Sequence, residues 1–207
     1  MMYIIGGAPR CGKTKLAKKL SSRLNIPIYS TDELRVRRVK EMSVNEVNLM
    51  FPFEKMFNGD KVDECFRKHN AEDFLNADKI ESNSLFKEIF YFIQHTLRSK
   101  NDFIIEGVHL LPCYINEFKL SKKECRVLYL VKVDEVKILN GLKLNRSKKD
   151  WIIGHIKKSI TLIRASKMVS VYGKYFVKES NKYNIPFINT EENFFKKLKE
   201  AENFFIK

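Results

Sequence analysis

The amino-acid sequence predicts a single three-layer α/β domain, in which helices cover both faces of a mainly parallel β-sheet. Short apolar runs alternate with segments of helical periodicity, and this alternation favours right-handed β-α-β crossovers. The length of 207 residues suits one domain of ordinary size. The sequence also shows no internal repeat, low-complexity tract or interdomain linker. We therefore expect residues 1–207 to form one unit.

Five short apolar runs are the expected strands, and segments with a helical apolar repeat separate them. The strands are expected at residues 2–5, 26–29, 102–106, 126–133 and 185–188. The helices are expected at residues 13–24, from residue 30 onward, and at residues 86–100, 134–144 and 152–176. The patterns SxxE at residues 30–33 and NxxE at residues 189–192 predict helix N-caps. Residues 43–83, with a proline and an Asn-Gly turn signal, predict several small helices over one face.

The composition excludes several classes of protein. The 16 Phe and 8 Tyr residues supply a real core, which excludes intrinsic disorder. No apolar run approaches the roughly 18 residues of a membrane span, and the N-terminus does not resemble a signal peptide, so we expect a cytoplasmic protein without a membrane partner. The four cysteines lack metal-site spacing and are expected to be reduced thiols.

The net charge of +14, from 39 Lys plus Arg and 25 Asp plus Glu, admits two interpretations. It suits anionic substrates, or it suits nucleic acid. Because the lysines are spread over the whole chain, nucleic acid as a partner is possible but not favoured. The oligomeric state is left open.

A phosphate-binding loop is the strongest motif of the sequence. Its pattern GxxxxGK[ST] follows an apolar strand and opens a helix, which is the context that its mechanism requires. Backbone amides and the helix N-terminus favour phosphate oxygens there, while the Lys13 ammonium reaches the β- and γ-phosphates and the Thr14 hydroxyl can ligate Mg²⁺. The alternative is a glycine-rich turn with an incidental Lys-Thr pair. We expect nucleoside triphosphate binding by Gly7, Ala8, Pro9, Arg10, Cys11, Gly12, Lys13 and Thr14.

Asp32 and Arg35 follow the second expected strand, at the edge of the sheet where ligands of α/β proteins bind. They are three positions apart and share one helix face. Asp32 can accept the proton of an attacking hydroxyl, and Arg35 can hold an anionic part of the acceptor. The alternative is that Asp32 merely interacts with the helix dipole.

Glu106 and His109 follow the third expected strand. A carboxylate at the end of a buried strand is costly unless it meets a cation, a metal-bound water or a substrate. Glu106 is therefore a candidate ligand on the metal side or the acceptor side, and Gly107 would allow a tight turn beside it. His109 is a candidate substrate ligand, with a satisfied buried histidine as the alternative.

The basic residues 143–149 predict a lid over the transferring phosphoryl group, continuing to about residue 151. Because phosphoryl transfer depends on positioning and on cations around the transferred group, Arg146 is a candidate catalytic cation, with Arg164 as a further contributor. The alternative is a solvated basic loop.

The segments GGAPRCGKT, STDELR and IIEGVHLLP together resemble the small P-loop kinases, most closely the 2-phosphoglycerate kinase type. They are also similar to zeta-toxin and chloramphenicol-phosphotransferase kinases. The resemblance covers about residues 1–112 and implies the P-loop NTPase fold, with a five-stranded parallel sheet in the order 2-3-1-4-5 and a small helical lid. It further implies ATP and Mg²⁺, Asp32 as base and Arg35 as an acceptor contact.

The sequence departs from the family pattern in two places, and these departures limit which properties of the family can be expected here. The lid holds one arginine among lysines, where the family usually has two, and residues 43–83, expected on the acceptor side, contain no matching motif. We expect a kinase that transfers the γ-phosphate of ATP to a hydroxyl or phosphate of a small, anionic acceptor. A polynucleotide 5′-hydroxyl kinase and a non-catalytic nucleotide-binding regulator are the alternatives.

Overall fold

A five-stranded parallel β-sheet forms the centre of the computed structural model, which describes residues 1–57, 61–121, 123–144 and 153–206. The strand order is β2-β3-β1-β4-β5, as the resemblance implies. The five strands are β1 (Met2–Gly7), β2 (Ile28–Ser30), β3 (Phe103–Glu106), β4 (Cys125–Val131) and β5 (Phe187–Asn189). All of the predicted strands are therefore present, with ends shifted by a few residues.

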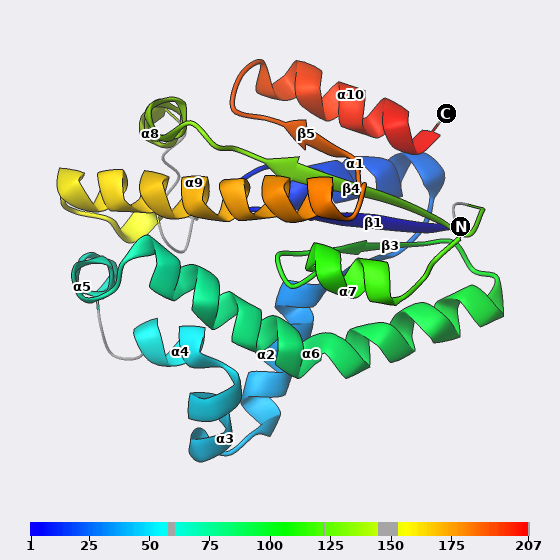
Figure 1. The fold of residues 1–207 in the computed structure, drawn as a ribbon, viewed down its shortest axis with the longest axis horizontal. Coiled ribbons are helices and arrows are strands. Elements are labelled where there is room, and N and C mark those ends of the chain that lie inside the picture. Colours follow the sequence, from blue (N-terminus) through cyan, green and yellow to red (C-terminus); the bar gives the residue numbers. More distant parts are fainter. Residues whose placement is uncertain (58–60, 122, 145–152, 207) are drawn as a thin grey trace.

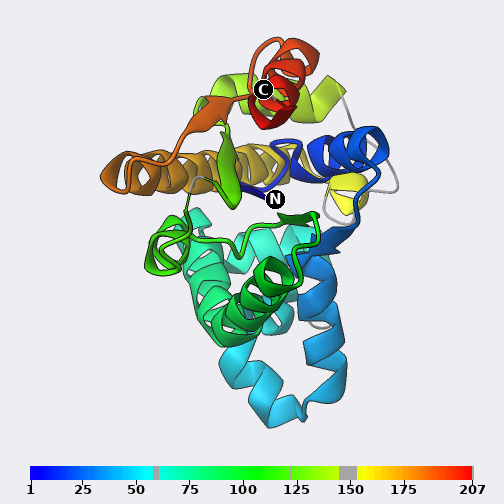
Figure 2. The same ribbon diagram turned by 90° about the vertical axis from the view of Figure 1, so that its right-hand side faces the viewer.

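Helices cover both faces of the sheet (Figures 1 and 2). The first and last helices, α1 (Lys13–Leu24) and α10 (Phe194–Ile206), pack together on one face. The long helices α6 (Ala71–Ser99) and α9 (Ser159–Lys182) pack on the other face and on each other. The remaining helices are α2 (Thr31–Glu41), α3 (Val44–Met50), α4 (Pro52–Phe57), α5 (Val62–Lys68), α7 (Pro112–Glu117), α8 (Glu135–Leu144) and the short 3₁₀ helix η1 (Ile153–His155).

Helix α6 is the largest departure from the predicted elements. It starts at Ala71, 15 residues before the expected helix at 86–100, so the small helices lie at 44–50, 52–57 and 62–68, and residues 71–83 belong to α6. Its start is a capping box in which Asn70 and Asp73 exchange hydrogen bonds of 2.9 and 3.0 Å. Asp78 and Glu81, which interrupt the apolar repeat of the sequence, are buried along with the apolar residues of this helix.

Of the two predicted N-caps, the first is confirmed in position and the second is wrong. Ser30 occupies the N-cap position of α2, but its side chain makes no capping hydrogen bond. Asn189 ends β5, and its side-chain oxygen accepts a hydrogen bond of 2.9 Å from the amide of Glu191. This local turn ends before α10 begins at Phe194. Within the expected helix 152–176, α9 begins only at Ser159, and residue 152 lies outside the described residues.

The strand register places the functional segments at one edge of the sheet. Glu106 pairs with Ile5 of β1 and with Ser30 of β2, so the three strands end side by side. The phosphate loop, the start of α2 and the segment after β3 all leave the sheet at this carboxyl edge. Among the described residues, no helix combines the length and apolar character needed to cross a membrane.

Candidate active site

Gly7 sets the direction in which the phosphate loop leaves β1. Its φ of 124° lies in the left-handed region, and a Cβ atom there would lie 2.0 Å from the Leu130 carbonyl oxygen. Only glycine fits a position that combines this dihedral angle with such a close approach. The loop then runs to Gly12, the N-cap residue of α1, as the motif predicts. An anion in the loop therefore faces the N-terminus of a 12-residue helix.

Lys13 is held inside the loop that it belongs to. Its ammonium donates a hydrogen bond of 2.9 Å to the carbonyl oxygen of Ala8, and the residue is buried. The side chain nevertheless lines the cavity described below. This arrangement places a full positive charge at the floor of the phosphate loop.

Residues near the C-terminal end of the described chain pack against the outer side of the phosphate loop. The Thr190 hydroxyl donates a hydrogen bond of 3.0 Å to the carbonyl oxygen of Cys11. The ring of Phe194, the first residue of α10, packs so closely on Gly12 that a Cβ atom there would lie 2.9 Å from it. The loop is thus supported by residues near the C-terminal end of the described chain.

Glu106 lies directly behind Thr14. The Thr14 hydroxyl donates a hydrogen bond of 3.1 Å to Oε1 of Glu106, whose side chain is buried. Burial raises the pKa of Glu106, against the opposing influence of the Lys13 charge. Its Oε2 atom has no hydrogen-bond partner among the described residues. A buried carboxylate with one unpartnered oxygen beside a threonine hydroxyl fits a hydrated Mg²⁺ ion, which binds oxygen ligands and keeps several waters.

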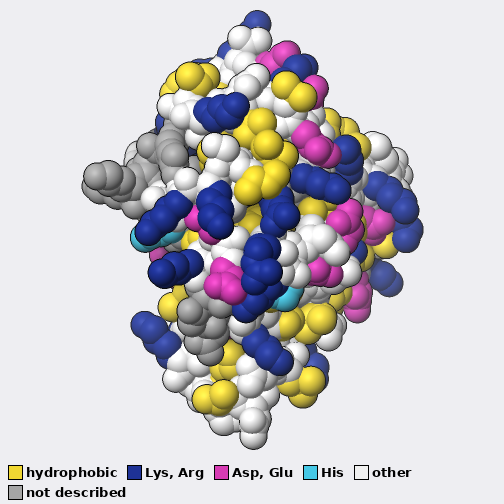
Figure 3. Space-filling model, turned by 90° about the vertical axis from the view of Figure 1, so that its left-hand side faces the viewer, with side chains coloured by type: hydrophobic (Ala, Val, Ile, Leu, Met, Phe, Trp, Pro, Cys, Tyr) yellow, Lys and Arg dark blue, Asp and Glu magenta, His cyan; other side chains and the backbone are white. Residues whose placement is uncertain are grey.

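One cavity of about 940 Å³ joins the phosphate loop to the start of α2 and the segment after β3. Lys13, Thr14, Asp32, Arg35 and His109 all line it. Figure 3 looks onto the carboxyl edge of the sheet, and Lys and Arg side chains are concentrated across the middle of this face. The structure therefore brings the predicted loop and the predicted acceptor-side residues to the two sides of one space.

Among the acidic residues that line the cavity, Asp32 is the most accessible. Its side chain is 61% exposed and lies 3.6 Å from Nδ1 of the buried His109. The same Nδ1 atom is 3.0 Å from the Thr31 hydroxyl. A Cβ atom at Gly107, where φ is 152°, would lie only 1.7 Å from that hydroxyl oxygen. The glycine thus lets Thr31 and His109 pack together next to Asp32.

Arg35 is already paired with two carboxylates. Its Nε donates a hydrogen bond of 2.5 Å to Oε2 of Glu81, and its Nη1 donates one of 3.2 Å to Glu54. Phe53 donates its amide to Oε1 of the same Glu81, at 2.7 Å. The predicted role of Arg35 was to hold an anion, and these contacts do not favour it, because the guanidinium charge is neutralised within the protein.

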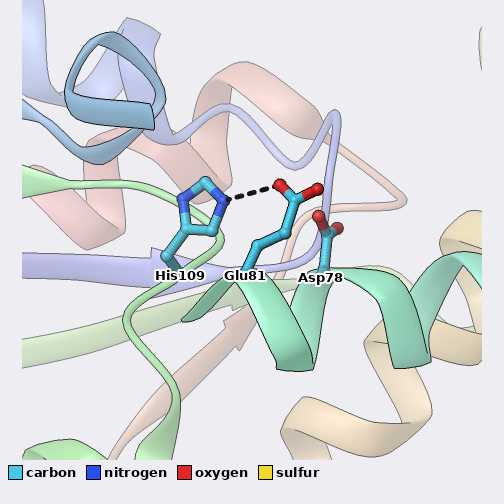
Figure 4. Close-up of side chains that lie close together, drawn as sticks. All are labelled: Asp78, Glu81 and His109. Atoms are coloured by element: carbon cyan, nitrogen blue, oxygen red, sulfur yellow. Dashed lines mark ion pairs between the residues drawn. The ribbon is translucent and has the colours of Figure 1, made fainter. Parts of the chain in front are cut away.

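Asp78 and Glu81 were missed by the sequence analysis. Both project from the same side of α6, with Glu81 pointing toward His109 (Figure 4), and ligand atoms of the three side chains lie within 4.8 Å of one another. Asp78 accepts a hydrogen bond from the Tyr172 hydroxyl, and burial raises its pKa to about 6. Acidic residues at apolar positions of a helical repeat were the available signal, since a buried charge is costly and needs a reason.

Most of the predicted lid lies outside the residues that the structure describes. Arg146 and residues 145–151 of the proposed lid lie outside the described residues, while Lys143 and Leu144 end α8. Arg164, the second candidate cation, donates a hydrogen bond of 2.9 Å to the carbonyl oxygen of Phe66. It does not line the described cavity.

The strand order, together with a phosphate loop after the first strand, defines the P-loop NTPase fold. No profile of a known protein family matches the chain. The chain is 25% identical over 191 residues to 2-phosphoglycerate kinase from Methanothermobacter thermautotrophicus. This alignment covers 91% of the chain and 60% of that relative, so the chain spans less than two thirds of the relative's length. The similarity confirms the resemblance to small P-loop kinases.

Solved structures with a similar arrangement include two shikimate kinases. For the enzyme from Aquifex aeolicus, the TM-score is 0.48 and the identity 20%, over 100% of this chain and 96% of that one. For the enzyme from Bacteroides thetaiotaomicron, the TM-score is 0.49 and the identity 14%, over 100% of this chain and 99% of that one.

Proposed function

We propose that the protein is a kinase that moves the γ-phosphoryl group of ATP to a hydroxyl group of a small-molecule acceptor in the cytoplasm. The observation that carries this proposal is the shared cavity, which has Lys13 and Thr14 on one side and Asp32 on the other. The similarity to 2-phosphoglycerate kinase supports a kinase of this general type.

The nucleotide half of the cavity is built by the phosphate loop and α10. The loop amides and the N-terminus of α1 bind the phosphates, and Lys13 exchanges its carbonyl contact for the β- and γ-phosphate oxygens. The Phe194 ring, which lines the same cavity, offers an apolar surface for the nucleotide base. Thr14 would hold Mg²⁺ and Glu106 would accept hydrogen bonds from its waters, and the ion would neutralise charge that develops on the phosphates.

The acceptor half positions the nucleophile. The carboxylate of Asp32 accepts the acceptor's hydroxyl proton while the acceptor oxygen forms a bond to the γ-phosphorus. The bond from that phosphorus to the bridging oxygen breaks, and ADP leaves with the electron pair. His109, 3.6 Å from Asp32, orients this carboxylate. We further propose that residues 43–83 select the acceptor, and that residues 143–151 with Arg146 close over the phosphates.

Replacing Asp32 with Asn tests the proposed base. Asp32→Asn should lower kcat by roughly 10²- to 10⁴-fold, the usual worth of general base catalysis, with little change in ATP affinity. The neighbouring Glu33, which is exposed and does not line the cavity, provides the matched control Glu33→Gln. Phosphoryl transfer from labelled ATP to pooled small molecules is the measurement.

The same assay separates the alternative functions. Transfer of the label to an oligonucleotide would indicate a polynucleotide kinase, whose binding should also weaken steeply with salt. Tight ATP binding without transfer to any acceptor would indicate a regulator. Equal activity of Asp32→Asn and Glu33→Gln would contradict the assigned base.

A further inference from the structure

The acceptor half of the cavity carries an excess of negative charge. Three carboxylates line it, those of Asp32, Glu54 and Asp78, against the single guanidinium of Arg35. The other described cations of the lining, Arg10, Lys13 and Lys15, belong to the phosphate loop and the start of α1. The positive and negative charges of the cavity are therefore separated into a nucleotide half and an acceptor half.

The positive charge of Arg35 is not available to a ligand and does not offset this negative charge. Its guanidinium contacts Glu81 at 2.5 Å and Glu54 at 3.2 Å, and Glu81 is completely buried. An anionic acceptor would have to compete with these two carboxylates and lie beside Asp32 and Asp78. Like charges in a partly buried space repel more strongly than in water, so the described lining opposes a carboxylate or a phosphate.

A buried polar atom without a partner marks the floor of the acceptor half. Nε2 of His109 has no hydrogen-bond partner among the described residues, although the side chain is only 1% exposed. It faces Glu81, whose Oε2 atom lies 3.9 Å away (Figure 4). Because buried polar groups are almost always satisfied, the atom points to a polar ligand group that enters between His109 and the two acidic residues of α6.

A divalent metal ion fits this cluster less well than an organic ligand. Arg35 is already paired with Glu81, and the Tyr172 hydroxyl is hydrogen-bonded to Asp78. The cavity is also lined by apolar side chains, which a metal ion does not need but the carbon skeleton of an acceptor does. These side chains are Val36, Phe53, Phe57, Ala165, Met168 and Val169.

We propose that the acceptor is a hydroxyl compound that carries an amino group and no acidic group. Its ammonium binds beside the carboxylate of Asp78, its carbon skeleton packs on the apolar lining, and its hydroxyl reaches Asp32. Nε2 of His109 bonds a second polar group of the same acceptor. This inference rests on the proposed kinase activity, and it replaces the anionic acceptor expected from the net charge of the sequence.

Matched acceptors that differ mainly in charge test the proposal. One set is glucosamine, glucose and gluconate, a second is serinol, glycerol and glycerate, and 2-phosphoglycerate is added as a further anion. The amine of each set should have a kcat/KM about tenfold or more above that of its acid, which is the effect of about one favourable contact. A higher kcat/KM for the acids or for 2-phosphoglycerate would overturn the inference and leave the kinase activity standing.

A charge-neutralising variant tests the assigned residue. Asp78→Asn should raise KM for the amine about tenfold and change KM for the neutral compound less than twofold. Glu72→Gln is the matched control, because Glu72 lies exposed on the same helix and does not line the cavity. An equal rise of KM for amine and neutral compound would show a merely structural role and overturn the assignment.

Binding can be measured without turnover. Calorimetric titration of the same compounds into the protein with a non-hydrolysable ATP analogue should show tighter binding of the amines than of the acids. Equal binding, absent binding or tighter binding of the acids would overturn the inference. Absence of phosphoryl transfer to any acceptor, with amines bound, would instead overturn the proposed kinase activity alone.

Discussion

The hydroxyl of Thr14 and the carboxylate of Glu106 are joined by a hydrogen bond of 3.1 Å, although 92 positions separate them in the sequence. The contact is possible because β1 and β3 are parallel neighbours whose ends lie in register, with Ile5 opposite Glu106. The sheet thus delivers a carboxylate to the back of the phosphate loop. The pairing of β1 with β3 therefore places the two groups proposed to hold Mg²⁺ next to each other.

Glu106→Gln should weaken the use of Mg²⁺ while leaving the fold intact. The amide keeps the shape of the side chain but loses the charge that would bind metal waters. The Mg²⁺ concentration needed for half-maximal ATP binding should rise roughly 10- to 100-fold, as for other outer ligands of metal sites. Titration of ATP binding with Mg²⁺ measures this, and Glu117→Gln, at an exposed position of α7, should behave like the parent protein.

Lys13→Ala should weaken ATP binding roughly 10- to 100-fold, because charge-assisted hydrogen bonds contribute about 1.5–3 kcal/mol each. Lys18, an exposed residue of the same helix, supplies the control Lys18→Ala. Equilibrium binding of labelled ATP measures both variants. Unchanged affinity of Lys13→Ala would refute the role assigned to the phosphate loop.

Gly107→Ala should destabilise the protein by about 2–4 kcal/mol. Its φ of 152° is unfavourable for alanine, and the new Cβ atom would lie 1.7 Å from the Thr31 hydroxyl oxygen. Gly141, in the middle of α8, is the matched control because a Cβ atom there meets nothing within 4 Å. Gly141→Ala should stabilise by about 0.5–1 kcal/mol. Urea unfolding compares the two, and similar effects would contradict this account.

Asp78→Asn should stabilise the protein, and more so at high pH. Burial raises the pKa of Asp78 from 3.8 to about 6, so between these values the native state holds a proton that the unfolded state has lost. Stability therefore falls as pH rises through this range, and the full cost is present above pH 6. The variant should gain roughly 3 kcal/mol at pH 8 and about half as much at pH 5.

Urea unfolding of Asp78→Asn and the parent at both pH values measures this gain. Glu72→Gln again serves as the control on the same helix. A gain that does not depend on pH would show that packing, and not the charge of Asp78, is responsible.

The residues near the phosphate loop could be predicted because local chemistry determines them. A strand, a glycine turn and a helix start follow each other within residues 2–24, and the strand order followed from the family resemblance. The position of Asp32 and His109 at the cavity could be predicted in the same way, because each lies two or three residues after a strand end at the same edge of the sheet.

Asp78 and Glu81 could not be found by the same reasoning. In the sequence they interrupt the apolar repeat of the helix, and only the packing of α6 against α9 and the segment after β3 buries them. Ile160 and Ile163 show the opposite error. They fit the apolar repeat of the expected helix, but about half of each side chain is exposed on α9. Periodicity describes one face of a helix and cannot say which neighbours will cover it.

The contacts of Cys11 and Gly12 with Thr190 and Phe194 have a consequence for synthesis on the ribosome. The loop is translated before the hydroxyl that donates a hydrogen bond to its carbonyl, because that hydroxyl lies 179 positions later. A nascent chain should therefore be unable to retain nucleotide until that segment has emerged from the exit tunnel. Nucleotide capture would then report that these two segments have met.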